Sequence, residues 1–273
     1  MSEQFRKKKQ YGQNFLTNPA IPQRIVKESG IDDSCGVLEI GPGLGALTLQ
    51  LAPVAKKIVA VEIDHELIDP LTEIFVPHPH ITLIENDIMK VDLEPLLKEQ
   101  FGDMPVCVCA NLPYYITTPI LMKLLEGKYG FRSITVMVQK EVAERLCAKS
   151  GQEGYGAITA SIGYYGTVKR LFTVTAGNFS PKPKVDSAVV RLDLYPECPF
   201  QVDNEPLYFE VIKAAFLQRR KTLSNALASY FPYLTKESVG DLLEELGLRR
   251  DARGEMLTSE QFALIANNIE KKK

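Results

Sequence analysis

The segment Asn111 to Tyr114, with the sequence Asn-Leu-Pro-Tyr, carries residue types that suit methyl transfer to an amino group on an aromatic ring. Such a nitrogen is a poor nucleophile, because its lone pair is delocalised into the ring. Two acceptors aimed at its hydrogens, the Asn111 side-chain oxygen and the Leu112 carbonyl, would favour a pyramidal nitrogen with a localised lone pair. Pro113 would stiffen the turn, and Tyr114 could stack on a base that has left its helix or loop. The alternative is a proline turn without a catalytic role.

A glycine-rich turn, EIGPGLGALT at residues 39–48, joins an expected strand to an expected helix. Gly41, Gly43 and Gly45 permit positive φ angles and let a ligand approach the backbone, and the start of the following helix offers unpaired N–H groups. This pattern predicts a nucleotide-like ligand, with a tight ligand-free turn and an NAD site as alternatives. The GxGxG spacing and the preceding Glu39 favour S-adenosylmethionine over NAD.

Two acidic residues are expected near the ends of the next strands. Glu62, in AVEID, can accept hydrogen bonds from both hydroxyls of a ribose, and Ile63 beside it is assigned to the same site. Asp87, in ENDIM, could accept a hydrogen bond from the adenine amino group of the ligand while Ile88 packs on the ring. The alternatives are a solvated strand end for Glu62 and a helix N-cap for Asp87.

An aromatic residue, Phe179, stands three and five residues before Lys182 and Lys184 in NFSPKPKVDSAVV, which is expected to be a hairpin loop. Phe179 could sandwich the target base from the face opposite Tyr114, while the lysines bind phosphates. Alternatively, Phe179 is a hydrophobic plug under the loop.

The overall charge does not itself indicate a nucleic-acid partner, because the net charge is −2 and the pI is near 6.0. RNA binding would therefore depend on local clusters of cations, each of which is alternatively a solvated face. The clusters are Arg6 to Lys9, Lys182 with Lys184, Arg219 with Arg220 and Lys221, Arg249 with Arg250 and Arg253, and Lys271 to Lys273.

No other catalytic cluster is evident in the sequence. The amino nitrogen becomes acidic as it gains a methyl group, so water can take its proton and no general base is required. The three histidines, His65, His78 and His80, are predicted to be surface residues. The five cysteines lack a CxxC spacing, and Cys107 and Cys109 alternate in an apolar run. We therefore predict buried free thiols and no metal site.

Strands that alternate with helices must position these residues. Apolar, β-rich runs predict strands, and the segments between them read as helices, notably 44–51 and 119–125. The chain therefore predicts a Rossmann-like, mostly parallel, doubly wound sheet. Two further runs, 168–174 and 188–194, predict an antiparallel hairpin that closes one edge of the sheet. The five strands of the alternating part are expected at Val37–Ile40, Ile58–Val61, Ile81–Ile84, Val106–Ala110 and Ile134–Val138.

A proline-rich stretch at 195–206 predicts a domain boundary in the 273-residue chain. We expect a catalytic domain over 1–197 and a small helical, RNA-binding domain over 198–273. No apolar run is long enough to span a bilayer, so a cytoplasmic protein without a membrane partner is expected. No leucine-rich seam indicates an obligate dimer, and a monomer is predicted. The C-terminal helices are expected at Leu207–Arg219, Lys221–Ser229, Lys236–Leu246 and Ser259–Ile269.

Together these motifs resemble the KsgA-type ribosomal RNA adenine dimethyltransferases. The resemblance rests on YGQNFL, LEIGPGLGALT, VEID, END, ANLPYYI, FSPKPKVDSAVV and AAFLQRRKTLSNAL, which run over almost the whole chain. It implies a seven-stranded sheet with one antiparallel strand and S-adenosylmethionine as methyl donor. It implies that Asn14 and Leu16 form a lid over the cofactor, and that Gly41, Glu62, Asp87 and Asn111 contact it or lie at its methyl end.

The resemblance further implies that two adjacent adenosines in a hairpin loop near the 3′ end of 16S rRNA each receive two methyl groups, in the context of small-subunit biogenesis. Three alternatives stay open: a 23S rRNA adenine methyltransferase of the macrolide-resistance type, an assembly factor that acts mainly by binding the immature small subunit, and a small-molecule or DNA adenine methyltransferase. The C-terminal motifs favour the small-subunit enzymes. Tyr115 stands where many relatives have Asn, and a proline expected near Ala252 is absent.

Overall fold

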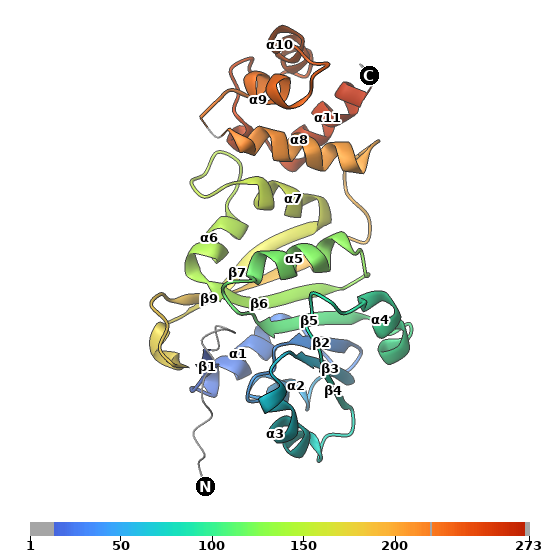
Figure 1. The fold of residues 1–273 in the computed structure, drawn as a ribbon, viewed down its shortest axis with the longest axis vertical. Coiled ribbons are helices and arrows are strands. Elements are labelled where there is room, and N and C mark those ends of the chain that lie inside the picture. The colour runs from blue at the N-terminus through green and yellow to red at the C-terminus, as the bar shows by residue number, and fades with distance from the viewer. Residues whose placement is uncertain (1–13, 219, 271–273) are drawn as a thin grey trace. The chain divides into compact units, whose positions relative to one another are not determined.

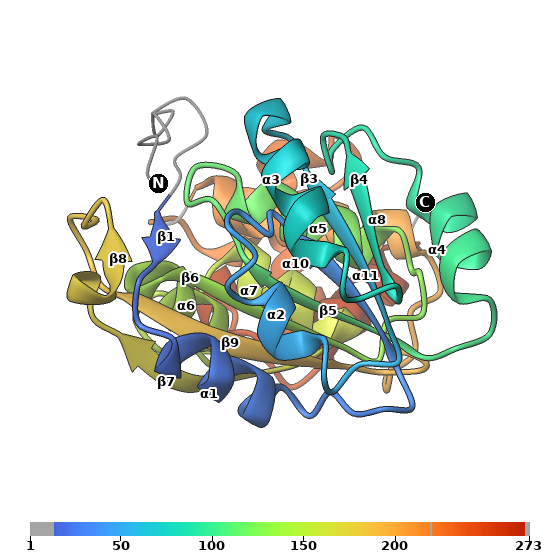
Figure 2. The same cartoon turned by 90° about the horizontal axis from the view of Figure 1, so that it is seen from below.

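The computed structural model describes residues 14–218 and 220–270 (Figures 1 and 2). The chain divides into two compact units. Unit 1 consists of the described part of Met1–Ala143 together with Val168–Leu194, and unit 2 consists of Glu144–Thr167 and the described part of Tyr195–Lys273.

Unit 1 is built around a seven-stranded sheet with the strand order β4-β3-β2-β5-β6-β9-β7. Strands β4, β3, β2, β5 and β6 are parallel, and β9 pairs antiparallel with β6. The predicted seven-stranded sheet with one antiparallel strand is confirmed. The two runs that were predicted to form an edge hairpin are the neighbouring strands β9 and β7 at one edge of the sheet. The strands are β2 (Gly36–Ile40), β3 (Lys57–Glu62), β4 (Ile81–Glu85), β5 (Val106–Asn111), β6 (Ser133–Gln139), β7 (Gly166–Val174) and β9 (Ser187–Leu194).

A second, two-stranded sheet joins β1 (Phe15–Leu16) to β8 (Phe179–Ser180), and the two strands lie side by side in Figure 2. Its pairing connects residues about 160 positions apart, with Leu16 opposite Phe179. This sheet was not predicted from the sequence, because two-residue strands leave no periodic pattern. The pairing holds the N-terminal segment against the loop that follows β7.

The central strands are buried because they are apolar on both faces, as is usual in parallel sheets. On one face, alternate residues such as Val37, Ile58 and Cys107 form a core with the apolar side of α1 and α2. The helices that precede β9 in the described chain are α1 (Ala20–Ser29), α2 (Thr48–Leu51), α3 (His65–Phe75), α4 (Leu93–Phe101), α5 (Thr117–Glu126), α6 (Lys140–Cys147) and α7 (Ala157–Tyr165), with a 3₁₀ turn η2 (Ala176–Asn178).

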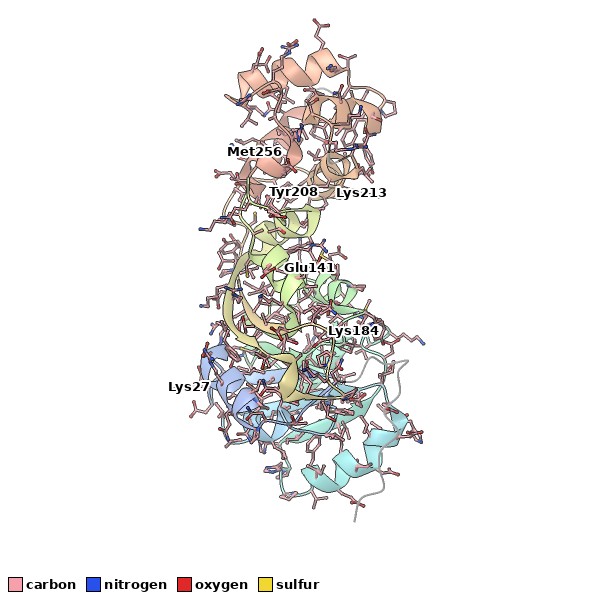
Figure 3. All side chains as sticks on the ribbon, turned by 90° about the vertical axis from the view of Figure 1, so that its left-hand side faces the viewer. Lys27, Glu141, Lys184, Tyr208, Lys213 and Met256 are labelled. Carbon is pink, nitrogen blue, oxygen red and sulfur yellow. The ribbon has the colours of Figure 1, made fainter. Side chains whose placement is uncertain are left out.

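Unit 2 has its own core, which includes the fully buried side chains of Tyr208 and Phe262; Tyr208 is labelled in Figure 3. Three of its helices begin at side-chain caps: Asn204 caps α8, Thr222 caps α9, and Thr235 and Ser238 form a capping box at α10. The C-terminal elements are α8 (Glu205–Leu217), α9 (Leu223–Tyr230), α10 (Lys236–Glu245), η3 (Gly254–Met256) and α11 (Ser259–Glu270).

Most predicted elements agree with the structure to within two residues, but the helix predicted at 44–51 is wrong in its first half. Only Thr48–Leu51 is helical, because the glycine loop continues as turns through Leu47. Residues 144–167 belong to the same compact unit as the C-terminal helices, whereas the sequence predicted them to be part of the catalytic domain. The reason is packing, since Tyr155 and Ala160 belong to the same core as α8.

Candidate active site

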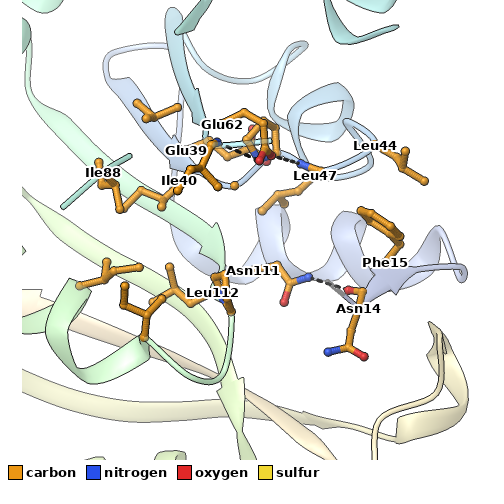
Figure 4. Close-up of a pocket in the computed structure, with 18 of the residues that line it drawn as sticks. Asn14, Phe15, Glu39, Ile40, Leu44, Leu47, Glu62, Ile88, Asn111 and Leu112 are labelled. Carbon is orange, nitrogen blue, oxygen red and sulfur yellow. Dashed lines mark hydrogen bonds between the residues drawn. The ribbon is translucent and has the colours of Figure 1, made fainter. Parts of the chain in front are cut away.

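A cavity of about 350 Å³ lies where β2, β3 and β5 reach their carboxyl ends (Figure 4). In doubly wound sheets this edge is the usual place for a ligand. The residues predicted to bind the cofactor line the cavity, except Gly45 of the glycine loop, and so do the three residues that follow Asn111. These residues are Asn14, Leu16, Gly41, Gly43, Glu62, Ile63, Asp87, Ile88, Asn111, Leu112, Pro113 and Tyr114.

The glycine loop forms one wall in a conformation that other residues rarely adopt. Gly41 and Gly43 have φ angles of 67° and 61°. A Cβ at Gly41 would meet no atom within 4 Å, so its Cα faces open space. A Cβ at Gly43 would lie 3.2 Å from the ring of Phe15. The loop therefore presents bare backbone to the cavity and leaves little room beside the N-terminal segment.

Glu62 is held by three backbone donors at the end of β3. Its Oε1 accepts hydrogen bonds from the amides of Ile63 and Asp64, each at 2.9 Å, and its Oε2 accepts one from Gly43 at 3.1 Å. Burial raises the pKa of this carboxyl, and the three N–H groups act in the opposite direction. The carboxylate is thus fixed in position against the glycine loop before any ligand arrives.

Glu39, the last-but-one residue of β2, is a second buried acid at the cavity. Its side chain is 1% exposed, and its Oε2 makes no hydrogen bond within the described residues. Burial raises the pKa of Glu39 to about 8; the nearby Thr48 hydroxyl opposes this rise, and the charge of Glu62 adds to it. At neutral pH the Glu39 carboxyl is therefore mainly protonated in the folded protein.

This buried acid predicts a stability that falls with rising pH. Between the ordinary pKa of 4.5 and about 8, the unfolded chain has released the Glu39 proton while the folded chain keeps it. The free energy of unfolding is then expected to fall by up to roughly 1.4 kcal/mol per pH unit across this window. Glu39→Gln should remove this component, so that urea denaturation without ligand shows a larger stabilisation at pH 8 than at pH 5. Glu73→Gln, at an exposed position, is the control; equal pH slopes for wild type and Glu39→Gln would contradict the assignment.

The loop after β4 forms another part of the cavity wall. Asp87 Oδ1 accepts a hydrogen bond from the Met89 amide at 2.9 Å, and the Asp87 carbonyl accepts from the Lys90 and Val91 amides at 2.8 and 3.1 Å. No helix begins here, so the N-cap alternative for Asp87 is wrong, and the residue organises a turn instead. Ile88 is buried, with 7% exposure, and lines the cavity beside Asp87.

Asn111 stands at the end of β5, and its side-chain Nδ2 donates a hydrogen bond to the carbonyl of Asn14 at 3.3 Å (Figure 4). A carbonyl can only accept, so the amide nitrogen must face Asn14. The Asn111 Oδ1 is thereby left on the other side of the amide, available as an acceptor. The N-terminal segment thus orients the side chain on which the predicted chemistry depends.

The rest of the tetrad is fixed by neighbouring elements. The Leu112 amide donates to the Met137 carbonyl at 3.2 Å, and the Pro113 carbonyl accepts from the Thr117 hydroxyl at 3.0 Å. The Tyr114 hydroxyl lies 2.7 Å from the hydroxyl of Ser187, the first residue of β9. Burial raises the pKa of Tyr114. The tetrad is therefore tied to β6, α5 and β9.

Phe179 does not line the cavity. Its ring is 4% exposed and packs with the sheet core beside Leu16, as the hydrophobic-plug alternative described. Its burial follows from the pairing of β8 with β1. Lys182 and Lys184 are exposed on the loop before β9, where Figure 3 labels Lys184.

The predicted cations of the helical unit differ in their surroundings. Arg249 pairs with Asp251 at 2.8 Å, and Arg250 pairs with Asp241 at 2.7 Å and with Glu244 at 3.1 Å. These carboxylates compete with phosphate for the two guanidinium groups. The two ion pairs of Arg250 link the loop after α10 to that helix, whereas the pair between Arg249 and Asp251 lies within the loop.

Arg220 and Lys221 are exposed, whereas Arg219 lies outside the described residues, as do the predicted clusters at 6–9 and 271–273. Within residues 14–218 and 220–270, no group of three or more His, Cys, Asp or Glu side chains could hold a metal ion. No helix in that part of the chain is long and apolar enough to cross a membrane.

Two of the five cysteines depart from the predicted burial. Cys35, Cys107 and Cys109 are buried as expected, but Cys147 and Cys198 are partly exposed. The periodic apolar context that buries Cys107 and Cys109 is absent around the other two.

Several residues that line the cavity, or that hold its lining in place, were not predicted. Phe15 and Leu47 line it, and the motifs YGQNFL and LEIGPGLGALT contained a signal for both. Ser187 lies 73 residues from its partner Tyr114, and Lys123 of α5 reaches the loop after β4. Contacts of this kind arise from the tertiary fold and leave no local pattern.

Comparison with known proteins gives a consistent assignment. The family model described as ribosomal RNA adenine dimethylase matches residues 4–271. The chain is 46% identical over 266 residues to ribosomal RNA small subunit methyltransferase A of Bacillus mycoides, covering 96% of this chain and 91% of that protein. The same values hold for the enzyme of the same name in Bacillus cereus.

Solved structures agree in fold over 94% of this chain. A dimethyladenosine transferase from Plasmodium falciparum matches with a TM-score of 0.80 and 27% identity, over 98% of its own chain. The 23S rRNA methyltransferase ErmE matches with a TM-score of 0.73 and 25% identity, over 100% of its chain.

Proposed function

This chain belongs to the ribosomal RNA adenine dimethylase family, and from this premise we propose that it dimethylates the exocyclic amino groups of two adjacent adenosines in a hairpin loop near the 3′ end of 16S rRNA. The observation that carries the proposal is a single cavity lined at once by the glycine loop, by Glu62 and by the Asn111 to Tyr114 tetrad. A cofactor and an amino group held in that cavity would lie next to each other.

The residues present fit S-adenosylmethionine. The open space at the Cα of Gly41 would be filled by a Cβ, and Glu39 contributes a buried carboxyl oxygen that has no partner within the described residues. Glu62, whose Oε2 has a lone pair left beside its bond from Gly43, would accept a hydrogen bond from a ribose hydroxyl, and Asp87 with Ile88 would hold the adenine. When bound, S-adenosylmethionine supplies an electrophilic methyl group on a sulfonium.

The tetrad would act on the methyl acceptor. The Asn111 Oδ1 and the Leu112 carbonyl would each accept a hydrogen bond from one N–H of the adenine amino group, which localises the nitrogen lone pair. Pro113 would fix the direction in which the Leu112 carbonyl points. Tyr114 would stack on the target base once that base has left the RNA loop. The proton that the nitrogen loses passes to water, so no side chain is needed as a base.

RNA binding is proposed for the exposed cations Lys182, Lys184, Arg220 and Lys221, with Arg219 in the same motif as Arg220. These side chains would contact phosphates and fix the orientation of the RNA without reading its sequence. Arg249 and Arg250 are expected to contribute less, because each already pairs with a carboxylate.

The small subunit is favoured over the large one by sequence similarity. The chain is 46% identical to enzymes named for the small subunit and 25% identical to ErmE, which is named for 23S rRNA. We further propose that the protein acts on the immature small subunit in the cytoplasm of the cell, as a monomer.

Mass spectrometry of ribosomal RNA tests this proposal. Small-subunit RNA from cells that lack the protein is expected to carry two adjacent unmodified adenosines in the 3′ hairpin loop. Addition of the purified protein and S-adenosylmethionine to the small subunits of those cells should convert both residues to dimethyladenosine. Persistence of both dimethyladenosines in the deletion strain, or methylation of 23S RNA instead, would contradict it.

A further inference from the structure

Lys123 is a charged residue on α5, whose neighbouring side chains Ile120, Leu121 and Leu124 are buried. Its ammonium donates hydrogen bonds to two backbone carbonyls, that of Met89 at 3.0 Å and that of Val91 at 2.7 Å. It forms no ion pair with a carboxylate in the described part of the chain. A lysine placed in this way serves as a donor to a loop and not as a surface charge.

The two carbonyls belong to the loop that follows β4. The amide N–H groups of this loop are used within it, since Met89, Lys90 and Val91 all donate to atoms of Asp87. The start of the loop is tied to β3 by a bond from the Asn86 amide to the Glu62 carbonyl at 2.9 Å. Lys123 therefore provides a tether at the far end of the loop.

Asp87 and Ile88 lie between these two tethers, and both line the cavity. We propose that Lys123 is a positioning residue that holds the loop of Asp87 and Ile88 in the geometry that binds the adenine of the methyl donor. The inference rests on the proposed function, because it assigns the adenine to this loop. Lys123 itself is absent from the cavity lining, so it acts through the loop and not by contact with the ligand.

The other end of α5 supports this role. Thr117, the first residue of the helix, is 2% exposed, and its hydroxyl donates to the carbonyl of Pro113. The same helix thus holds the tetrad at its start and the adenine loop at Lys123, six residues later. Because the same helix holds the tetrad and the adenine loop, it fixes the distance between the adenine and the methyl acceptor.

Ligand affinity tests the proposal directly. Lys123→Met keeps most of the aliphatic chain and removes the donors, and it is expected to weaken S-adenosylhomocysteine by about tenfold in calorimetry. Adenosine alone should lose the same factor, because the affected contacts are at the adenine. The kcat at saturating cofactor and the KM for RNA should stay within about twofold of wild type, and Lys123→Arg should recover part of the affinity. Lys90→Met, which removes an exposed lysine from the same loop, is the matched control and should bind like wild type.

Unchanged affinity for both ligands in folded Lys123→Met would overturn the proposal. The proposal would also be overturned if Lys123→Met impaired kcat and the KM for RNA as much as ligand affinity, and if Lys90→Met lost affinity to the same extent. That pattern indicates a general structural role. If Lys123→Met does not fold, Lys123→Gln, which retains one donor group, decides by the same two affinities. Failure of the wild type to methylate RNA would refute the proposed function, whereas normal wild-type activity with normal ligand binding by Lys123→Met would refute this inference alone.

Discussion

Replacing Asn111 with alanine is expected to lower kcat for RNA methylation by about 10²- to 10³-fold, as for the loss of one preorganised polar group at a reacting centre. The reason is geometric: the Asn111 Oδ1 is one of two acceptors proposed to localise the lone pair of the target nitrogen. The side chain is held by the Asn14 carbonyl, so its acceptor is in place before the substrate binds. Single-turnover kinetics with small-subunit RNA would measure the loss, and the melting temperature would verify the fold.

Asn111→Asp is the matched variant, because it keeps the shape and the acceptor. It replaces the nitrogen that faces the Asn14 carbonyl, at 3.3 Å, with a second oxygen. Two oxygen acceptors with no proton between them cannot form a hydrogen bond, so the side chain of this variant should be displaced. Its activity should lie between that of wild type and that of Asn111→Ala. An alanine variant with more than a tenth of wild-type kcat would refute the role of Asn111 as acceptor.

The variant Asn111→Ala also separates catalysis from binding in the cell. If growth and small-subunit maturation stay normal in cells that carry Asn111→Ala while the dimethyladenosines vanish, then binding to the immature particle is the main role of the protein. If maturation fails as it does in the deletion strain, methylation itself is required. Both outcomes leave the chemical assignment intact, because it is decided by the kinetics.

The strands were predictable because apolar β-rich runs separated by helical segments leave a strong periodic signal. The predicted runs at 37–40, 58–61 and 106–110 lie within β2, β3 and β5. These three strands carry the glycine loop, Glu62 and Asn111, so the alignment of the carboxyl ends followed from the topology alone. The residues predicted to bind the cofactor and the methyl acceptor at 111–114 therefore line one cavity, whereas Phe179 and the predicted RNA-binding cations of the described chain do not.

Phe179 shows what local reasoning could not decide. Its position before two lysines in a turn-rich segment is compatible with an exposed stacking residue and with a buried plug. The choice is made by the N-terminal strand β1, which pairs with β8 and encloses the ring. A contact between residues more than 160 positions apart leaves no signal in the local sequence, and the same is true of the bonds made by Ser187 and Lys123.

The acids of the site were identifiable from the sequence, but their charge states were not. Glu39 and Glu62 are both next to turns and both at strand ends. Three backbone N–H groups face the carboxylate of Glu62, whereas the Oε2 of Glu39 finds no hydrogen-bond partner in the described chain. The difference depends on the path of the backbone at Gly43 and Asp64, which a motif does not specify.

Glu62→Gln is expected to weaken S-adenosylhomocysteine by about 10- to 10²-fold, while kcat at saturating cofactor changes much less. A carboxylate can accept from the three backbone amides and still bond to a ribose hydroxyl, because each oxygen has two lone pairs. The amide of glutamine turns an NH₂ group toward at least one of those donors and loses the charge that strengthens the ribose bonds. Calorimetry with S-adenosylhomocysteine measures the change, and Glu73→Gln is the surface control.

The pH dependence adds a second, independent measure of the same residue. Because burial raises the pKa of Glu62, its protonation in the folded protein occurs above the ordinary value of 4.5. Cofactor affinity should therefore be full above the folded pKa and fall as the pH decreases through it, whereas Glu62→Gln should lack this decrease. The ribose contact predicts further that Glu62→Gln weakens adenosine but leaves 2′,3′-dideoxyadenosine unchanged. Equal losses for the two nucleosides would show that Glu62 acts only through the glycine loop, and the assignment to the ribose would be wrong.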